Sequence, residues 1–147
     1  MKQQMINEMT LRFVSRSANE AFARAAAAAF VAQLDPTVEQ IYDIKTAVSE
    51  AVTNAIVHGY RDTLGMITMR VRLFAPAAVE IVIRDKGCGI ADVAQAREPL
   101  FTTGGTDRSG MGFTIMESFM DRLTVRSQPG KGTAVTLRKT LEPRKQA

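Results

Sequence analysis

The chain has 147 residues, of which 46% are hydrophobic and 23% are charged, and its formal net charge is +4 at pH 7. This composition is typical of a soluble globular protein, so we expect one domain over residues 1–147 and find no signature of a disordered or membrane protein. No apolar run reaches membrane-spanning length, and the single cysteine, Cys88, has no partner for an internal disulfide, which together predict a cytoplasmic protein without a membrane partner.

The positive charge is not gathered into a run, so we expect no direct nucleic-acid partner. Only the tail at 143–147 is locally basic, and it is expected to be frayed. In chain order, the alternation over Met9–Phe13 predicts a short strand. A capping-box pattern from Ser17 to Glu20 then opens an alanine-rich helix over 21–30.

The second predicted helix runs from about Val38 to His58, with Pro36 at its first position and Gly59 at its end. At about 100° per residue, its apolar residues gather on one side. They are Ile41, Ile44, Val48, Ala51, Val52 and Ala55. Asp43, Glu50, Asn54 and His58 gather on a stripe roughly opposite, which aligns carboxylate, amide and imidazole groups along one edge of the helix.

Two strands follow, each with one apolar face. Ile67, Met69, Val71 and Leu73 alternate with polar residues, and Val79, Ile81 and Ile83 do the same in the next strand. Asp85 continues the inward face of this second strand. Because an unpaired buried charge is costly, this carboxylate must find a hydrogen-bond donor.

Six of the ten glycines fall between Asp85 and Gly112, before a segment with helical spacing at 113–120. Glycines that lead into a helix N-terminus suit phosphate binding. Strands are predicted at Leu123–Val125 and over 133–137, where Thr133 shares the inward face with Val135 and Leu137. The element order predicts an α+β fold: a two-layer sandwich of a mostly antiparallel sheet with helices on one face.

Four motifs in this order resemble the GHKL (Bergerat-fold) ATP-binding family. They are Glu50 with Asn54 on one helix, the Asp85-Lys-Gly87-Cys-Gly89 turn, a glycine-rich segment that would form an ATP lid at about 97–110, and the late Gly132-Thr133 pair. Within that family, Ser49–Tyr60, Pro99–Thr103 and Arg108–Glu117 are similar to the anti-sigma-factor serine kinases of sporulation, as are 22–24 and 32–36. The resemblance covers nearly the whole chain.

The resemblance implies a kinase that uses ATP and Mg²⁺, binds a sporulation sigma factor and phosphorylates an anti-anti-sigma factor. Asp85 would accept the adenine amino proton, with Gly87, Gly89 and Thr133 beside the base. Asn54 would coordinate Mg²⁺, and Glu50 would accept the proton of the attacking hydroxyl.

The remaining candidates follow from the same resemblance. Arg108 would be catalytic, and His58 is a further candidate for contacting the phosphates or the lid. The lid and the helix after it would supply the other nucleotide contacts: Thr102, Thr103, Gly104, Gly105, Ser109, Gly110, Met111, Gly112 and Phe113. This lid is slightly short and lacks the lysine that the family pattern predicts between Thr103 and Arg108.

Self-association and partner binding are also expected. A short first strand would leave an exposed sheet edge, and the resemblance points to a homodimer through that sheet. On the first helix, Arg24 lies off the predicted apolar side and resembles the arginine that the family presents to both partners. That predicted apolar side is Phe22, Ala25, Ala26, Ala29 and Phe30.

Other functions stay open at this point. The main alternatives are an ATP-gated sigma-binding module without kinase activity, and an anti-sigma kinase of the general stress type. A histidine-kinase catalytic domain would need a separate phospho-acceptor domain, for which 147 residues leave no room. A zinc site from Glu50, Asn54 and His58 is poor because asparagine is a weak zinc ligand. A DNA-binding protein is the weakest alternative, since no recognition motif accompanies the charge.

Overall fold

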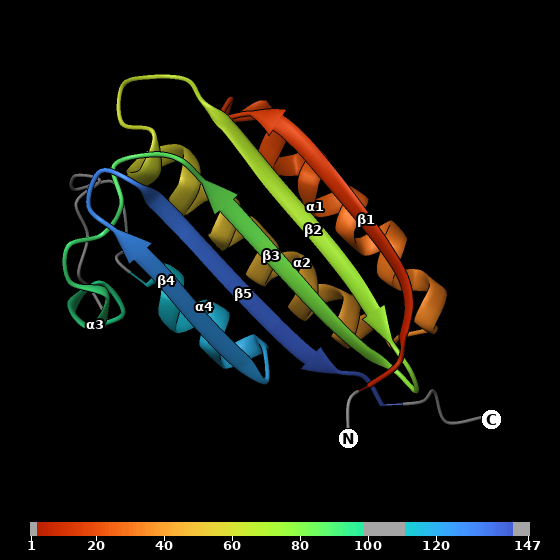
Figure 1. Cartoon of the computed structure of the whole chain (residues 1–147). Coiled ribbons are helices and arrows are strands. Elements are labelled where there is room, and N and C mark those ends of the chain that lie inside the picture. The colour runs from red at the N-terminus through yellow and green to blue at the C-terminus, as the bar shows by residue number, and fades with distance from the viewer. Residues whose placement is uncertain (1–2, 99–110, 143–147) are drawn as a thin grey trace.

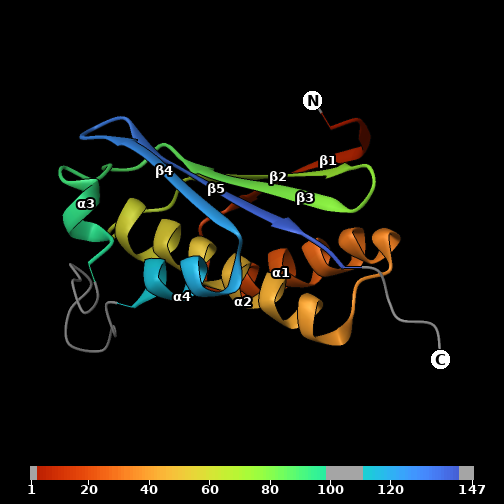
Figure 2. The same cartoon turned by 90° about the horizontal axis from the view of Figure 1, so that it is seen from below.

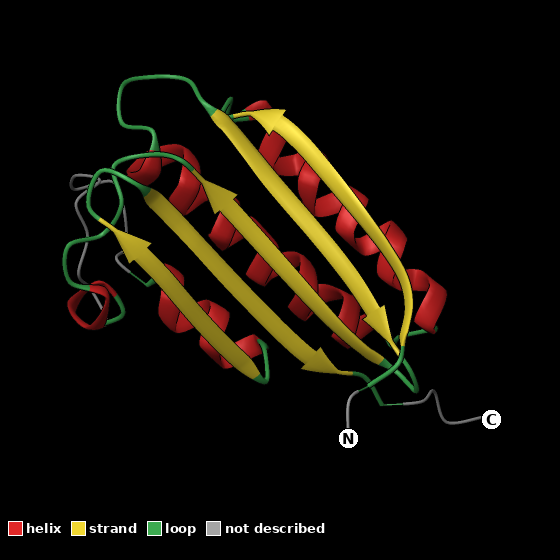
Figure 3. Cartoon of the chain, viewed as in Figure 1, coloured by secondary structure: helices red, strands yellow, loops and turns green. Residues whose placement is uncertain are grey.

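The computed structural model describes residues 3–98 and 111–142. Its elements are five strands with helices between β1 and β2 and between β3 and β4 (Figure 3). In order they are β1 (Met5–Val14), α1 (Ala18–Val31), the 3₁₀ turn η1 (Ala32–Leu34), α2 (Val38–Asn54), the π-helical turn η2 (Ala55–Gly59), β2 (Met66–Phe74), β3 (Ala78–Asp85), α3 (Val93–Ala96), α4 (Gly112–Phe119), β4 (Arg122–Gln128) and β5 (Gly132–Thr140).

The strands form one five-stranded sheet in the order β1-β2-β3-β5-β4, and every neighbouring pair is antiparallel. Helices α1, α2 and α4 all lie on one side of this sheet, as the views in Figures 1 and 2 show. The predicted two-layer α+β architecture is therefore confirmed. None of the helices in the described ranges is both long and apolar enough to cross a membrane.

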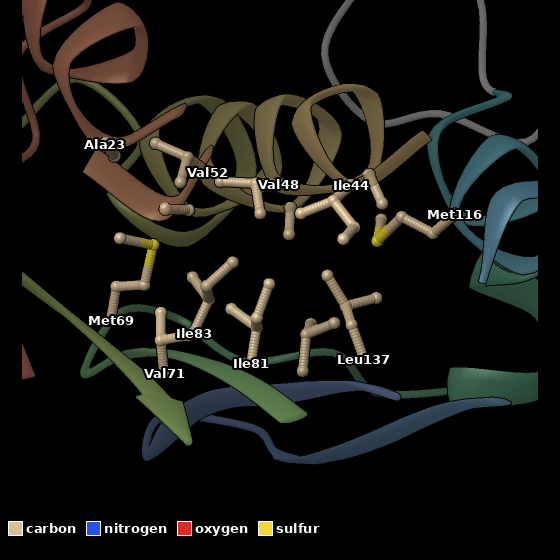
Figure 4. Packing of buried hydrophobic residues seen from close by; sticks show 14 of the residues in the cluster. Ala23, Ile44, Val48, Val52, Met69, Val71, Ile81, Ile83, Met116 and Leu137 are labelled. Atoms are coloured by element: carbon tan, nitrogen blue, oxygen red, sulfur yellow. The ribbon is translucent and has the colours of Figure 1, made fainter. Parts of the chain in front are cut away.

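The core lies between α2 and the three central strands (Figure 4). Ile44 and Val48 of α2 face Ile81, Ile83 and Leu137 of the sheet, and each of these side chains is at most 2% exposed. Full burial of one such side chain stabilises a fold by about 1.5–3 kcal/mol. This apolar layer therefore fixes the position of α2 relative to β3 and β5. It thereby also fixes the position of the polar edge of the helix.

Helix α1 begins without the predicted capping box. Ser17 has helical torsions (φ −55°, ψ −35°), whereas a capping residue needs an extended backbone, and its side chain makes no cap hydrogen bond. Glu20 instead accepts a hydrogen bond from the Ser49 hydroxyl of α2. The Glu20 side chain, which the local pattern predicted to cap the start of α1, therefore makes a contact with another helix instead.

The buried side of α1 also differs from the prediction. Ala23, Ala27 and Val31 are fully buried, whereas Phe22 is 54% exposed. Ala25 and Ala29 are exposed, and Ala26 and Phe30 are partly buried. Alanine occupies so many positions that the periodicity carried little information, and the two phenylalanines pointed to the wrong stripe. Small buried side chains let α1 pack closely against α2.

The boundaries of α2 also move. Its cap is Thr37, which forms a capping box with Gln40, so Pro36 precedes the cap rather than occupying the first helical position. The α-helix ends at Asn54, and η2 replaces the predicted last turn with a wider one in which the Tyr60 N–H reaches the Ala55 carbonyl. Such π-turns are frequent at functional sites.

Strand β1 is longer than the predicted Met9–Phe13. Its N-terminal half pairs with the far end of β2, across an irregularity between Met5 and Asn7. Pairing with β2 therefore extends β1 toward its N-terminus, where the sequence of β1 shows no alternation. The short helix α3 was not predicted, because four residues are too few to show helical periodicity.

Candidate active site

A cavity of about 730 Å³ opens between α2, η2, the ends of β3 and β5, and the start of α4. This volume is within the range of small-molecule sites. Eight predicted site residues line it: Glu50, Asn54, His58, Asp85, Gly89, Gly112, Phe113 and Thr133. Gly87 and Met111 adjoin it in the chain. The other candidates, Thr102, Thr103, Gly104, Gly105, Arg108, Ser109 and Gly110, lie outside the described residues, as does most of the predicted lid.

Asp85 lies at the end of β3 and is 8% exposed, on the inward face that the alternation predicted. Its Oδ1 accepts a hydrogen bond of 2.9 Å from the Gly87 N–H. Burial raises the pKa of Asp85, while the backbone N–H groups of Gly87 and Thr133 act in the opposite direction. The predicted donors for this buried carboxylate are therefore backbone groups of the neighbouring turn and strand.

Close backbone approach explains the glycines around this carboxylate. A Cβ on Gly87 would lie 2.0 Å from the carbonyl oxygen of Gly59, and one on Gly132 would lie 2.2 Å from that of Asp85. Gly89 has a left-handed φ of 74° and passes close to the Gln128 carbonyl. Three segments thus pack main chain against main chain, and no side chain larger than hydrogen fits between them.

Ser127 supports two lining residues, Ile90 and Thr133, and was not predicted from the sequence. It faces Thr133 across the β4–β5 ladder, and the two hydroxyl oxygens are 2.7 Å apart. Ser127 Oγ also accepts a hydrogen bond from the Ile90 N–H at 2.7 Å. This hydroxyl therefore orients Thr133 and ties the loop after β3 to the sheet. The alternation of Leu123 and Val125, continued by two residues, would have predicted that Ser127 lies on the same face of the strand.

Tyr60 was also missed. Its hydroxyl donates to the Met66 carbonyl at 2.6 Å and accepts from the Lys86 N–H at 2.7 Å. The ring packs against Gly65, where an added Cβ would lie 2.2 Å from it. The tyrosine thereby fixes the loop after β3 relative to η2. A buried tyrosine after a helix end carries no periodic signal.

Glu50 and Asn54 lie together beneath the start of α4. A Cβ on Gly112 would be 3.2 Å from both side-chain heteroatoms of Asn54 and 3.3 Å from Glu50 Oε2. Burial raises the pKa of Glu50, and the negative charge of Glu20 adds to this effect. Asp43, on the same predicted stripe, lies outside the cavity lining and pairs with Lys139 at 3.6 Å.

His58 and Cys88 meet at the wall of the cavity formed by η2. The Cys88 thiol lies 3.0 Å from the His58 carbonyl oxygen, and the Cys88 N–H donates to the Gly59 carbonyl at 2.9 Å. These contacts join η2 to the turn after Asp85. The cysteine, to which the sequence assigned no chemistry, packs in the wall of the cavity.

The family model that describes the histidine kinase-like ATPase domain matches residues 13–139. The chain is 56% identical over 137 residues to the anti-sigma F factor of Geobacillus kaustophilus (strain HTA426), covering 92% of this chain and 93% of that protein. It is 54% identical over 134 residues to the anti-sigma F factor of Thermoanaerobacter sp. (strain X514), with 90% and 93% covered.

Solved structures show the same fold at low identity. The crystal structure of the RsbU and RsbW domains of Rv1364c from Mycobacterium tuberculosis matches with a TM-score of 0.68 at 20% identity, over 94% of this chain and 34% of that one. The histidine kinase domain of the Erythrobacter litoralis EL346 blue-light activated histidine kinase matches with a TM-score of 0.55 at 20% identity, over 83% and 60%. The family model and the two anti-sigma F factors place the chain in the predicted GHKL family of histidine kinase-like ATPases and, within it, in the family of the anti-sigma F factors.

Proposed function

We propose that this chain is an ATP-dependent serine kinase that holds a sporulation sigma factor, sigma F, and phosphorylates an anti-anti-sigma factor. The observation that carries the proposal is the joint position of Glu50 and Asn54 beneath the start of α4, in the same cavity as Asp85. The names of the relatives at 54–56% identity support the sigma factor as the partner.

The cavity has two chemically different ends along α2 and η2. Gly59, which touches Asp85, lies five residues after Asn54 and nine after Glu50. At 1.5 Å per residue the two regions are separated by about 8–14 Å along the helix axis. This separation suits an extended nucleotide with its base at Asp85 and its terminal phosphate at Glu50.

Asp85 fits the adenine amino group. The carboxylate is buried, and two backbone N–H groups donate to it, whereas an ionised carboxylate offers about four acceptor sites. Acceptors therefore remain for an exocyclic amino group. Gly87 and Gly89 keep side chains away from the base, and Thr133, oriented by Ser127, provides a further hydroxyl beside it.

The phosphate end would combine an amide oxygen with backbone donors. Asn54 supplies an oxygen that suits Mg²⁺, which typically takes one or two protein ligands and keeps several waters. Within the described ranges, no cluster of three histidine, cysteine, aspartate or glutamate side chains could hold a metal by itself, which agrees with a cation held partly by phosphate. The N-terminus of α4 at Gly112 adds a positive dipole end.

Glu50 has the chemistry of the general base. When bound, ATP supplies the phosphoryl group that is transferred to the serine hydroxyl. The ionised Glu50 would accept the hydroxyl proton as the serine oxygen forms its bond to the γ-phosphorus and the bond from that phosphorus to the bridging oxygen breaks, so that ADP leaves. Burial and the charge of Glu20 both raise the pKa of Glu50, which makes it a stronger proton acceptor than an exposed glutamate. By the family resemblance, Arg108 would be catalytic and His58 would contact the phosphates or the lid.

Transfer of radiolabel from γ-labelled ATP to a purified anti-anti-sigma factor tests the kinase activity. We expect label on a serine of the substrate with wild type and strongly reduced label with Glu50→Gln. A protein that binds ATP and retains sigma F but transfers no label would instead be the ATP-gated binding module. Label transferred to histidine would indicate the chemistry of the histidine kinases.

Two assemblies belong to the same proposal. β1 is an edge strand of the sheet, and Met5 and Ile6 on it are 48% and 53% exposed, so a second copy pairing there would cover apolar surface. Arg24 is on α1, and its side chain is 40% exposed. An accessible guanidinium suits a partner that offers a carboxylate for bidentate pairing.

A further inference from the structure

The face of the sheet that points away from the helices is rich in arginine. Helices α1, α2 and α4 lie against the other face (Figure 2), toward which the buried strand residues point. Each of the five strands places arginine at alternate, outward positions. These arginines are Arg12 on β1, Arg70 and Arg72 on β2, Arg84 on β3, Arg122 and Arg126 on β4, and Arg138 on β5. Because alternation separates them in the sequence, they form no basic run, and the pairing of the strands gathers them on one surface, which we call the outer face.

One row of residues across the outer face is largely neutralised. Strand pairing places Glu8, Arg72, Glu80, Arg138 and Arg122 side by side in this order. Glu8 Oε1 lies 2.8 Å from Arg72 Nε, and Glu80 Oε2 lies 3.6 Å from Arg138 Nε. The signs alternate from Glu8 to Arg138, so this row leaves net positive charge chiefly at Arg122.

A second row carries arginines and no acidic residue. Strand pairing places Arg12, Thr68, Arg84, Ala134 and Arg126 side by side in this order. At about 4.8 Å between strands, the three arginines are spaced about 9.6 Å apart across the sheet, with one small residue between neighbours. All three arginine side chains are exposed, and none forms an ion pair with another described residue. The row is therefore a line of accessible guanidinium groups without a carboxylate among them.

The residue types around this row favour a phosphate ligand. A guanidinium group is planar and can donate two parallel hydrogen bonds to one phosphate. The neighbouring row adds the hydroxyls of Thr10, Thr136 and Thr124 beside Arg70. Threonine hydroxyls commonly donate to phosphate oxygens of nucleic acids. A line of such donors matches a linear chain of phosphates better than it matches a single small anion.

The same two rows lack the features that other anionic partners need. Their one large apolar residue, Val82, is only 6% exposed. Protein interfaces usually have an apolar core with aromatic side chains, and interfacial binding to a membrane buries apolar residues among the lipids. Single-stranded nucleic acid is bound by stacking on aromatic side chains. The backbone of a duplex needs none of these features, because it is bound through charge and the release of counterions.

We propose that the outer face binds the phosphate backbone of duplex DNA without reading its sequence, with Arg12, Arg84 and Arg126 as the principal contacts. The residue after Arg84, Asp85, is buried on the opposite face, where the cavity lies. DNA and nucleotide would therefore occupy opposite sides of the sheet. For this reason the inference does not depend on the proposed kinase function.

Fluorescence anisotropy tests the proposal with a labelled duplex of mixed sequence and the full nucleotide-free chain, at several salt concentrations. Three phosphate contacts predict that log K falls against log[salt] with a slope of about −2.7. Arg84→Ala should make this slope shallower by about 0.9, and replacement of all three arginines by alanine should remove most of the salt-dependent binding. Lys45→Ala removes the same charge from α2 on the helix side, so it is the matched control and should keep the wild-type slope.

Wild type that binds no duplex at low salt would overturn the proposal, as would a triple variant with the wild-type slope or a Lys45→Ala variant with the same loss. Circular dichroism and titration with ATP check the fold of the triple variant. If it does not fold, Arg12→Ala and Arg126→Ala decide the question, since each should change the slope as much as Arg84→Ala does.

The same titrations with phosphatidylserine vesicles and with polyglutamate separate DNA from other anionic partners. We expect both to bind more weakly than the duplex. Tighter binding to either one than to the duplex, lost in the same arginine variants, would overturn the assignment to DNA. The outer face would then belong to a membrane or to an acidic protein.

Discussion

The carboxylate of Asp85 lies directly against the α-carbon of Gly59: a Cβ there would fall 2.8 Å from Asp85 Cγ and 2.9 Å from its Oδ1. Gly59→Ala should therefore displace the carboxylate and weaken nucleotide binding, at a stability cost of about 1–3 kcal/mol from overpacking. Calorimetric titration with an ATP analogue and chemical denaturation measure the two effects. In an Asp85→Ala background the methyl group has room, so Gly59→Ala should cost much less stability there; an equal cost in both backgrounds would place the clash elsewhere.

Asp85→Asn should abolish nucleotide binding while the fold stays intact. Asparagine keeps an oxygen for the Gly87 N–H but presents an amino group where the adenine amino group needs an acceptor. Calorimetry with ATP checks binding, and circular dichroism checks the fold. A folded variant with wild-type affinity would refute the adenine assignment.

The stability of the nucleotide-free chain should fall as pH rises above the ordinary carboxylate range. Burial raises the pKa values of Asp85 and Glu50, so the folded state binds protons that the unfolded state has already released. The stability is complete below the unfolded pKa values and decreases until pH passes the folded ones. Denaturant midpoints measured across this window should depend less on pH in Asp85→Asn and Glu50→Gln. A slope that neither variant reduces would assign the effect to other groups.

Glu50→Gln should retain ATP binding but slow phosphoryl transfer by the ~10²–10⁴-fold typical of a lost general base. The amide keeps the size of the side chain beneath Gly112 but cannot accept the hydroxyl proton. Single-turnover transfer to the anti-anti-sigma factor measures the step directly. Glu39→Gln, on the exposed first turn of α2, is the control and should transfer phosphate at the wild-type rate. An unchanged rate in Glu50→Gln would show that Glu50 is not the general base.

Arg24→Ala should weaken the complexes with both sigma F and the anti-anti-sigma factor, while ATP affinity stays unchanged. The guanidinium is accessible, its pairing with Glu20 is long at 3.8 Å, and it lies outside the cavity lining. Titration of each partner in the presence of ATP measures the loss, with Arg126→Ala as a distant control. Wild-type affinity for both partners would move the docking surface away from Arg24.

The proposed homodimer should appear in solution as about twice the chain mass of 16.1 kDa. Replacement of Ile6 by lysine should shift the protein toward the monomer, because a charge on the exposed edge strand opposes strand pairing. Light scattering at micromolar concentration measures both masses. A monomeric wild type would contradict pairing through β1.

Short-range patterns in the sequence determined the layers and most of the cavity. Alternation assigned the inward faces of β2, β3 and β5 because burial on one face selects every second residue, and it put Asp85 and Thr133 on those faces. The pairing of β3 with β5, which places the two residues opposite each other, came from the tertiary structure. The four-residue spacing of Glu50, Asn54 and His58 likewise placed them on one edge of a helix, because a helix turns once in 3.6 residues, and all three line the cavity from α2 and η2.

Tertiary structure decided what depends on contacts between distant segments. The Glu20 side chain matched a local capping box, yet it bonds to Ser49 because α1 packs on α2 and Ser17 keeps helical torsions. The buried side of α1 depends on how closely its alanines let α1 and α2 approach each other. A run of alanines has no apolar periodicity, so the sequence does not show which of them face α2. Ser127 and Tyr60 reach the site only because the sheet and η2 bring their hydroxyls to backbone groups many residues away, and no spacing within the chain reports such a distance.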